Sequence, residues 1–333
     1  MASFSVVIPV YNAEKYLSEA IQSITNQTFA DWELVLVDDC STDQSIEIIQ
    51  QFMKRDSRIR LYKLPKNSGS AYRPIQKGIT KANYEWIVVM GDDDYLEEDY
   101  LKKLNERLEM THADIVFPRM YSITNEKKVL CSIPKADFDM NQVLSGEDAC
   151  MLTIPHWIIG ANGGGVRKSI FLKAWEQDND QYSGMNADEL LTRKICLCAP
   201  KVAFTDSKYF YRYHEESITK KFTEKRFHIL QTDLLLKKLI EKHFGINTVE
   251  SAKVNAKISY GVVLCASLFY RNLNRILPAN RQSIRDEIKH SWEQIQWKQA
   301  KPYIPYSRYL LFHYNFEIMM FFIRLHTYVK RHK

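Results

Sequence analysis

Three consecutive aspartates, Asp92, Asp93 and Asp94, follow a short apolar run over residues 86–90. The run has the length of a buried strand, so the three carboxylates should lie together where that strand ends. Like charges at such close spacing are costly unless a cation offsets them. Mg²⁺ and Mn²⁺ take oxygen ligands, often one or two carboxylates together with phosphates of a bound molecule. The triad therefore favours a metal-assisted site for a phosphorylated ligand, with a solvated acidic turn as the alternative.

Two more polar clusters follow apolar runs earlier in the chain. Residues 9–12 (PVYN) come after the first run, and Asp38 and Asp39 come after the run over residues 34–37. The two carboxylates have the chemistry to accept hydrogen bonds from a ribose or from a base N–H. Tyr11 is suited to lie against the flat face of a base, or else is an ordinary aromatic at the rim.

The elements that position these clusters are strands alternating with helices. Over the first 110 residues the periodicity predicts strands at 4–8, 34–37, 59–64 and 85–90. Asn12 predicts a helix cap at one start, and residues 41–44 have the spacing of a capping box at another. This alternation predicts a mostly parallel sheet with helices on both faces. Ligands of such sheets lie beyond the carboxyl ends of the strands, where all three clusters fall.

The second half of the chain has a different pattern. Short strands are predicted at 114–117, 128–132, 202–204 and 209–213, with a helix at 186–197. Beyond residue 219 the chain is predicted to be helical, with segments at 224–243, 249–276, 281–297 and 309–329. A chain of 333 residues is long enough for two domains. We predict one domain over residues 1–218 and a helical region over residues 219–333.

Composition excludes several classes of protein. The six cysteines are scattered without zinc-site spacing, which indicates reduced thiols in a cytoplasmic protein. The N-terminus lacks a signal-length apolar core, and no run is long enough to span a membrane. The net charge of +6 comes with no nucleic-acid-binding motif, so no nucleic-acid partner is expected. Residues 301–333 carry six Lys or Arg against one Glu. This amphipathic, basic end predicts peripheral contact with the inner face of the cytoplasmic membrane, or packing on protein, including a homodimer.

Residues 5–12 (SVVIPVYN), 37–43 (VDDCSTD) and 91–94 (GDDD) together resemble the family 2 glycosyltransferases of the GT-A fold. The order and spacing of the three blocks carry the resemblance over the first hundred residues, and it continues more weakly to about residue 219. It implies an α/β GT-A fold, with residues 1–110 as the nucleotide-sugar half and 111–218 as the acceptor half. It also implies transfer of a hexosyl or N-acetylhexosaminyl group from a nucleotide-sugar, with inversion at the anomeric carbon.

The resemblance assigns roles to the residues at the strand ends. Pro9, Tyr11 and Asp39 are implied to line the nucleoside pocket. Asp92 is implied to lie beside the ribose and the metal, and Asp93 to be the principal ligand of Mg²⁺ or Mn²⁺. Asp94 is implied to position the donor sugar or its loop.

Two positions depart from the family's pattern. Gly91 stands where the family usually has the first acid of an Asp-x-Asp pair, which leaves metal contact to the following carboxylates. Arg73 precedes Pro74 about two residues earlier than the family's Arg-Asn pair. Arg73 is therefore either a ligand of the donor phosphates or a solvated arginine at a helix start.

The second half supplies the remaining candidates. An inverting transfer needs a base to take the proton from the attacking hydroxyl. Residues 186–193 (NADELLTR) resemble the family segment that provides it, so Asp188 is the candidate base and Glu189 the fallback. Both acids would equally suit a helix N-terminus. His214 is a candidate second metal ligand by the same resemblance, and Trp157 a candidate surface for the acceptor sugar.

The leading hypothesis is therefore an inverting, metal-dependent glycosyltransferase of surface-polysaccharide synthesis. Its donor would be a UDP-sugar, and its acceptor a hydroxyl of a glycan or a lipid-linked glycan. The alternative is a catalytically silent sugar-nucleotide or partner-binding module, which Gly91 and Ala187 leave open. A sugar nucleotidyltransferase is disfavoured because residues 9–13 lack the Gly-rich loop of that class.

Overall fold

The chain forms two compact units in the computed structural model, which describes residues 2–124, 127–130, 138–152, 154, 162–176, 185–213 and 222–331. The first unit comprises Met1–Thr153, Trp157–Ser183 and Leu191–Lys221. The second comprises Ile154–His156, Gly184–Leu190 and Phe222–Lys333. The second unit is therefore the C-terminal region joined by two short segments from the middle of the chain.

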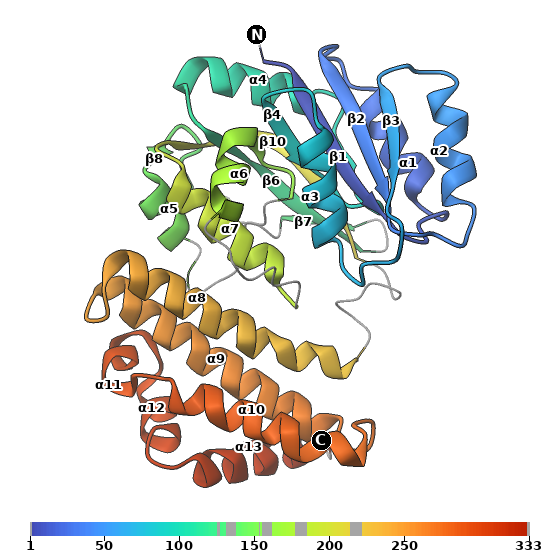
Figure 1. The fold of residues 1–333 in the computed structure, drawn as a ribbon. Helices are drawn as coiled ribbons and strands as arrows, with labels where there is room; N and C mark the ends of the chain where they lie inside the picture. Colours follow the sequence, from blue (N-terminus) through green and yellow to red (C-terminus); the bar gives the residue numbers. More distant parts are fainter. Residues whose placement is uncertain are drawn as a thin grey trace. The chain divides into compact units, whose positions relative to one another are not determined.

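A mixed sheet runs through the first unit (Figure 1). Its strands lie in the order β3-β2-β1-β4-β9-β6-β10-β5, with β7 beside β6 and β8 beside β10. The four strands from β3 to β4 are parallel, as predicted, whereas β9 runs antiparallel to both of its neighbours. The described strands are β1 (Phe4–Val10), β2 (Trp32–Asp38), β3 (Ile59–Lys63), β4 (Trp86–Val89), β5 (Tyr95–Leu96), β6 (Ile115–Thr124), β7 (Lys127–Leu130), β8 (Val143–Leu144), β9 (Gly165–Arg167) and β10 (Val202–Arg212).

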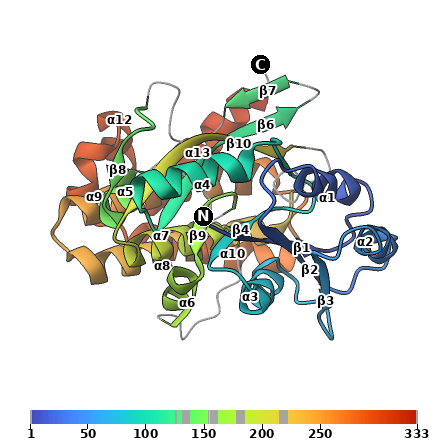
Figure 2. The same cartoon turned by 90° about the horizontal axis from the view of Figure 1, so that it is seen from above.

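Helices cover both faces of this sheet, and α3 and α6 lie together on one side of it in Figure 2. Successive residues of β1 point to opposite faces of the sheet and pack against the helices on each side. Val6 and Ile8 belong to a core cluster with residues of α1 and α4, whereas Val7 faces α3. Gly78 of α3 lies so close to Val7 that a Cβ would have no room, so glycine allows the close approach. The helices of the unit are α1 (Leu17–Thr25), α2 (Ser45–Met53), α3 (Tyr72–Lys81), α4 (Tyr100–Thr111), α5 (Gly146–Leu152), α6 (Lys168–Glu176) and α7 (Ala187–Cys198).

Two predicted helix starts are wrong. Asn12 does not cap a helix, because it has a left-handed φ of 51° and its side-chain oxygen accepts from Thr42 N–H. Ser41 does not open a capping box, because its hydroxyl accepts from Asn12 N–H instead. The helices begin later, at Leu17 and Ser45. Asn12 and Ser41 therefore form hydrogen bonds between the two loops instead of capping the helices that follow.

The strand β10 also differs from the prediction. It is one continuous strand, where the sequence pattern predicts two short ones. A shift in its pairing with β6 between Phe204 and Lys208 interrupts the apolar alternation that the prediction depends on.

The second unit is helical, as predicted. The long helix α9 packs against α8, α10, α11 and α13. The predicted helix over 309–329 is two helices, because Asn315 accepts hydrogen bonds from the N–H groups of Glu317 and Ile318 and so caps a new helix. No described helix is long and apolar enough to cross a membrane. The described helices are α8 (Ile229–Phe244), α9 (Val249–Arg271), α10 (Arg281–Glu293), α11 (Trp297–Ala300), α12 (Tyr306–Phe312) and α13 (Phe316–Arg331), with 3₁₀ turns at Glu224–His228, Pro278–Asn280 and Lys301–Tyr303.

Candidate active site

Hydrogen bonds join the carboxyl ends of β1 and β2. Asp39 N–H donates to the carbonyl of Val10 at 2.8 Å. Thr42 N–H donates to Asn12 Oδ1 at 2.8 Å, and Asn12 N–H donates to Ser41 Oγ at 3.1 Å. The positive φ angles of Asn12 (51°) and Cys40 (65°) show that both loops turn sharply to make these contacts. The loop that carries Tyr11 is thereby held against the loop that carries Asp39.

The carboxylate of Asp39 joins β2 to the loop after β3. Its Oδ1 accepts from Ser68 N–H and its Oδ2 from Ser68 Oγ–H, both at 2.8 Å. Asn67 Nδ2–H donates to the Asp39 carbonyl at 2.9 Å. Asp39 is buried, so its side chain fixes the shape of this loop. Asp39 therefore supports the loop after β3 from the end of β2.

Asp92 links the end of β4 to the first loop. Its Oδ2 accepts from Tyr11 N–H at 3.2 Å, while the Tyr11 ring stays 51% exposed. Burial, and then the charge of Asp93, raise the pKa of Asp92 to about 7. The end of β4 thus holds more negative charge than its surroundings neutralise. The predicted convergence of Tyr11, Asp39 and the triad at one edge of the sheet is present, with Pro9 half-buried one residue before the end of β1.

Asp94 is buried at 3% exposure and is held from β10. Tyr209 O–H donates to its Oδ2, and Arg212 N–H donates to its Oδ1 at 2.9 Å. Burial raises the pKa of Tyr209 well above its usual value, so the phenol keeps its proton and donates. Burial and the charge of Asp93 also raise the pKa of Asp94. Asp94 therefore supports the acidic corner, which we define as Asp92, Asp93 and Asp94 after β4. It is bound by residues of the distant strand β10.

Arg212 is the cation nearest to this corner in the contacts described. Its Nε–H donates to the Asp93 carbonyl at 2.9 Å, and its Nη2 lies 2.6 Å from Glu19 Oε2. The guanidinium also lies over the rings of Tyr16 and Tyr95. Neither Tyr209 nor Arg212 was a sequence candidate, although both lie in the strand over which the family resemblance ends.

The structure explains why glycine occupies position 91. A Cβ there would lie 2.6 Å from Asp94 Oδ2 and 3.0 Å from Asp93 Oδ1. The N–H of Gly91 donates to Tyr209 Oη at 3.0 Å, which draws the Asp94 carboxylate over the glycine. Glycine at this position departs from the family pattern, and it leaves room for the Asp94 carboxylate to lie against the backbone of residue 91.

We expect Gly91→Ala to destabilise the protein by about 1–3 kcal/mol, since the added methyl displaces a carboxylate held by two hydrogen bonds. Urea unfolding measures this change. Gly165→Ala is the matched control, because the nearest atom to its new Cβ would be Leu104 Cδ1 at an ordinary 3.4 Å. Equal losses in the two variants would contradict the steric explanation.

Asp92 and Asp93 are the two half-buried carboxylates of the triad. Their oxygens are the donors that a hard divalent cation prefers, and the negative charge of Asp93 beside Asp92 is one that a cation would offset. No group of three or more His, Cys, Asp or Glu among the described residues is arranged to hold a metal. Asp92 and Asp93 alone would leave the rest of a cation's coordination to other oxygens, such as those of a phosphate.

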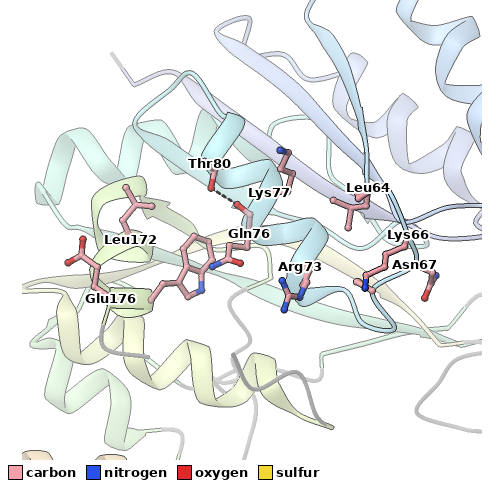
Figure 3. Close-up of a pocket in the computed structure, with 12 residues that line it drawn as sticks. Leu64, Lys66, Asn67, Arg73, Gln76, Lys77, Thr80, Leu172 and Glu176 are labelled. Atoms are coloured by element: carbon pink, nitrogen blue, oxygen red, sulfur yellow. Dashed lines mark hydrogen bonds between the residues drawn. The ribbon is translucent and has the colours of Figure 1, made fainter. Parts of the chain in front are cut away.

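A cavity of about 980 Å³ lies beside this edge, between α3, α6 and the loop after β3. Figure 3 shows Arg73 and Gln76 on α3, Lys66 and Asn67 on the loop, and Leu172 and Glu176 on α6. Arg73 therefore faces a cavity lined also by Lys66 and Lys77. Tyr11 and the three aspartates do not line it, and the Asn67–Ser68 turn, which Asp39 holds, connects it with them.

The candidate base and its fallback have different surroundings in the second unit. Asp188 is half-buried in the first turn of α7, after Asn186, which has a φ of 61°. Glu189 is fully buried, with its Oε1 3.4 Å from Lys257 Nζ, which lies 2.6 Å from Asp233 Oδ1. This buried ion cluster makes Glu189 a structural residue, which favours Asp188 as the base.

The other two candidates, Trp157 and His214, lie outside the described residues. Their predicted roles stay predictions.

Comparison with known proteins identifies the first part of the chain. Residues 5–132 match the model of the family described as Glycosyl transferase family 2. An uncharacterized glycosyltransferase of Haemophilus influenzae is 38% identical over 144 residues, which cover 41% of this chain and 56% of the relative. Glycosyltransferase GlyG of Streptococcus pneumoniae is 29% identical over 232 residues, covering 64% of this chain and 72% of the relative.

A third relative has also been solved as a structure. The poly(ribitol-phosphate) β-N-acetylglucosaminyltransferase TarS of Staphylococcus aureus is 28% identical over 223 residues, covering 65% of this chain but only 36% of TarS. The crystal structure of TarS residues 1–349 with UDP-GlcNAc superposes with a TM-score of 0.71 at 19% identity, covering 99% of this chain and 92% of that one. This likeness confirms the predicted GT-A fold followed by a helical region.

Proposed function

The chain carries a family 2 glycosyl transferase domain, and from this premise we propose that it transfers a sugar from a UDP-sugar to a hydroxyl group of a glycan or lipid-linked glycan. One observation carries the proposal. Hydrogen bonds tie the carboxyl ends of β1, β2 and β4 and the loop after β3 into one rigid edge that presents Tyr11 and the triad. Preorganised polar groups at such an edge suit a nucleotide ligand.

The donor nucleoside is proposed to lie on Tyr11 and Pro9, above the loop that Asp39 supports. Asp92 would face the ribose, and Asp94 would keep the β4 loop in place for the donor sugar. Arg73, on the side of the adjoining cavity, is suited to the charge of the diphosphate. These assignments agree with the exposure of the Tyr11 ring and with the burial of Asp39 and Asp94.

Asp93 and His214 are the residues proposed to hold Mg²⁺ or Mn²⁺, with Asp92 beside them. When bound, the cation would offset the charge that develops on the leaving diphosphate. Asp188 is proposed to accept the proton of the acceptor hydroxyl as its oxygen bonds to the anomeric carbon and the bond to the diphosphate breaks. This direct displacement inverts the anomeric configuration, and Trp157 is proposed to contact the acceptor sugar.

The named relatives favour an N-acetylhexosaminyl or hexosyl donor. TarS is named as an N-acetylglucosaminyltransferase, and its structure holds UDP-GlcNAc. A glycosyltransferase of Bacillus subtilis named for teichuronic acid biosynthesis is also similar, at 37% identity over 99 residues. We propose a surface polysaccharide or its lipid-linked precursor as the acceptor, modified in the cytoplasm. The free state of the five described cysteines suits a reducing compartment.

The test is release of UDP from UDP-GlcNAc, UDP-glucose and UDP-galactose, each with MnCl₂ or EDTA, alongside thermal unfolding with each donor. Bound donor should raise the unfolding midpoint, and UDP should form only with metal. A donor that raises the unfolding midpoint but releases no UDP, even when a lipid-linked glycan is supplied as acceptor, would favour the catalytically silent binding module. No effect of any donor would contradict the proposed function altogether.

We expect Tyr11→Ala to weaken UDP binding about tenfold, because stacking of an aromatic ring on a base contributes roughly 1–3 kcal/mol. The unfolding midpoint of the free protein should not change, since the ring is 51% exposed. Titration calorimetry with UDP measures the loss. Tyr84→Ala, at a tyrosine that is 37% exposed, is the control and should bind UDP like the unmodified protein.

A further inference from the structure

Helix α13 is apolar on two opposite sides. One side is buried and packs in the second unit through Phe316, Met319, Met320 and Ile323. At 3.6 residues per turn, a second stripe falls on the opposite side of the helix. This outer stripe consists of Ile318, Phe321, Phe322, Leu325, Tyr328 and Val329, which are 38–63% exposed.

A helix on a protein surface normally presents polar residues on the side away from the core. The outer stripe instead places six large apolar side chains on consecutive turns, and such contiguous patches mark interaction sites. Figure 1 shows α13 as the C-terminal helix of the second unit. Tyrosine, which the outer stripe contains at Tyr328, is enriched where an apolar phase meets water, and phenylalanine and leucine are typical of the apolar face of interfacial helices.

A cationic groove adjoins the outer stripe. It is a cavity of about 720 Å³ lined by Arg281 and Arg324, and it shares Phe321, Leu325 and Tyr328 with the stripe. None of the described residues that line it is acidic. The Nε of Arg281 is shielded from solvent and has no hydrogen-bond acceptor among the described residues. Since no described acid lines the groove beside Arg281 and Arg324, the two guanidinium groups suit an anionic oxygen.

We propose that the outer stripe and this groove form a docking surface for an anionic membrane, with a phospholipid phosphate between Arg281 and Arg324. The stripe would lie in the boundary between headgroups and acyl chains. The proposal adds a partner to the protein and does not depend on the proposed reaction.

Charge distinguishes a membrane from a second copy of the chain. No acid occurs from residue 318 to 333, whereas the same helix carries Arg324 and Lys330, and Arg331 follows in the sequence. The one acid of this helix, Glu317, is engaged with Arg285. A two-fold contact through the stripe would bring these like charges together, whereas an anionic lipid surface would neutralise them.

The test is flotation of the full chain with vesicles of phosphatidylcholine alone or with 30% phosphatidylglycerol. We expect the chain to bind the anionic vesicles. The Phe321→Ser/Leu325→Ser variant should bind them at least tenfold more weakly. Arg281→Gln/Arg324→Gln should remove the preference for anionic lipid while keeping the unfolding midpoint. Ile246→Ser/Val249→Ser is the control, because both residues are exposed apolar positions elsewhere in the second unit. Inorganic phosphate is added as a competitor and should not displace the bound protein.

Three outcomes would overturn the proposal. The first is that the unmodified chain does not float with either vesicle. The second is that the control loses binding as much as the stripe variant. The third is that light scattering shows a vesicle-free dimer that Phe321→Ser/Leu325→Ser dissociates, which would assign the stripe to a second copy.

Discussion

Replacing Asp93 with alanine should lower sugar transfer by roughly two to three orders of magnitude while the protein stays folded. The carboxylate is half-buried and is the proposed metal ligand, and lost electrostatic stabilisation of a leaving group typically costs this much. The fold should tolerate the change because Arg212 binds the carbonyl of Asp93, which alanine retains. UDP release at saturating donor, measured over a range of Mn²⁺ concentrations, is the readout.

Asp99→Ala provides the matched control for this prediction. Asp99 is a partly exposed aspartate five residues after the triad, where it forms an ion pair with Lys103. Its loss should leave the rate within about twofold, because surface ion pairs contribute little. Transfer by Asp93→Ala at the unmodified rate and with unmodified Mn²⁺ dependence would remove the metal role from this carboxylate.

Replacing Lys257 with methionine should destabilise the second unit by about 3–5 kcal/mol. Lys257 lies between the buried carboxylates of Glu189 and Asp233, and removing one partner of a buried ion cluster leaves the others uncompensated. Denaturant unfolding followed by circular dichroism measures the loss. Lys253→Met, at a half-buried lysine on the same helix, is the control and should cost less than about 1 kcal/mol.

The cost of Lys257→Met should depend on pH in a defined direction. Burial raises the pKa of Asp233 to about 6, and Lys257 opposes this rise. Without the lysine the folded-state pKa moves further above the unfolded value, so the native state holds its proton more tightly. Stability is then lost as pH rises through that pKa, and the variant should be damaged more at pH 8 than at pH 5. A penalty that is the same at both pH values would contradict this account, and Asp233→Asn/Lys257→Met should recover part of the stability.

The first hundred residues were predictable in architecture because their signals are local. Each parallel strand is a short apolar run that ends in a polar cluster, so strand order along the chain places Tyr11, Asp39 and Asp92 at one edge. Helix starts were less predictable, since Asn12 and Ser41 have the composition of caps but bond to each other's loops. Which partner a short polar side chain selects depends on the tertiary arrangement, which a local pattern does not contain.

Residues that act through long-range contacts could not be predicted. Tyr209 and Arg212 reach the triad from a strand more than 110 residues away, and nothing in their own neighbourhood signals this. Glu189 and Asp188 are adjacent acids at a helix start, and the burial of Glu189 beside Lys257 distinguishes their surroundings. The departure at Gly91 likewise depends on a distant residue, because Tyr209 binds the Asp94 carboxylate that leaves no room for a Cβ at position 91.

The hydrogen bonds between β10 and the acidic corner affect the order in which the site forms while the chain is synthesised. Asp94 and its partner Tyr209 are 115 residues apart, so at 5–20 residues per second a ribosome needs roughly ten seconds more to deliver the strand that holds it. Until then a nascent chain has the loops that are proposed to face the nucleotide, but its cluster of three carboxylates lacks the support of Tyr209. Competence to bind the donor should therefore arise in one late step, when β10 pairs with β6 and Tyr209 reaches Asp94, rather than accumulating as the preceding strands emerge.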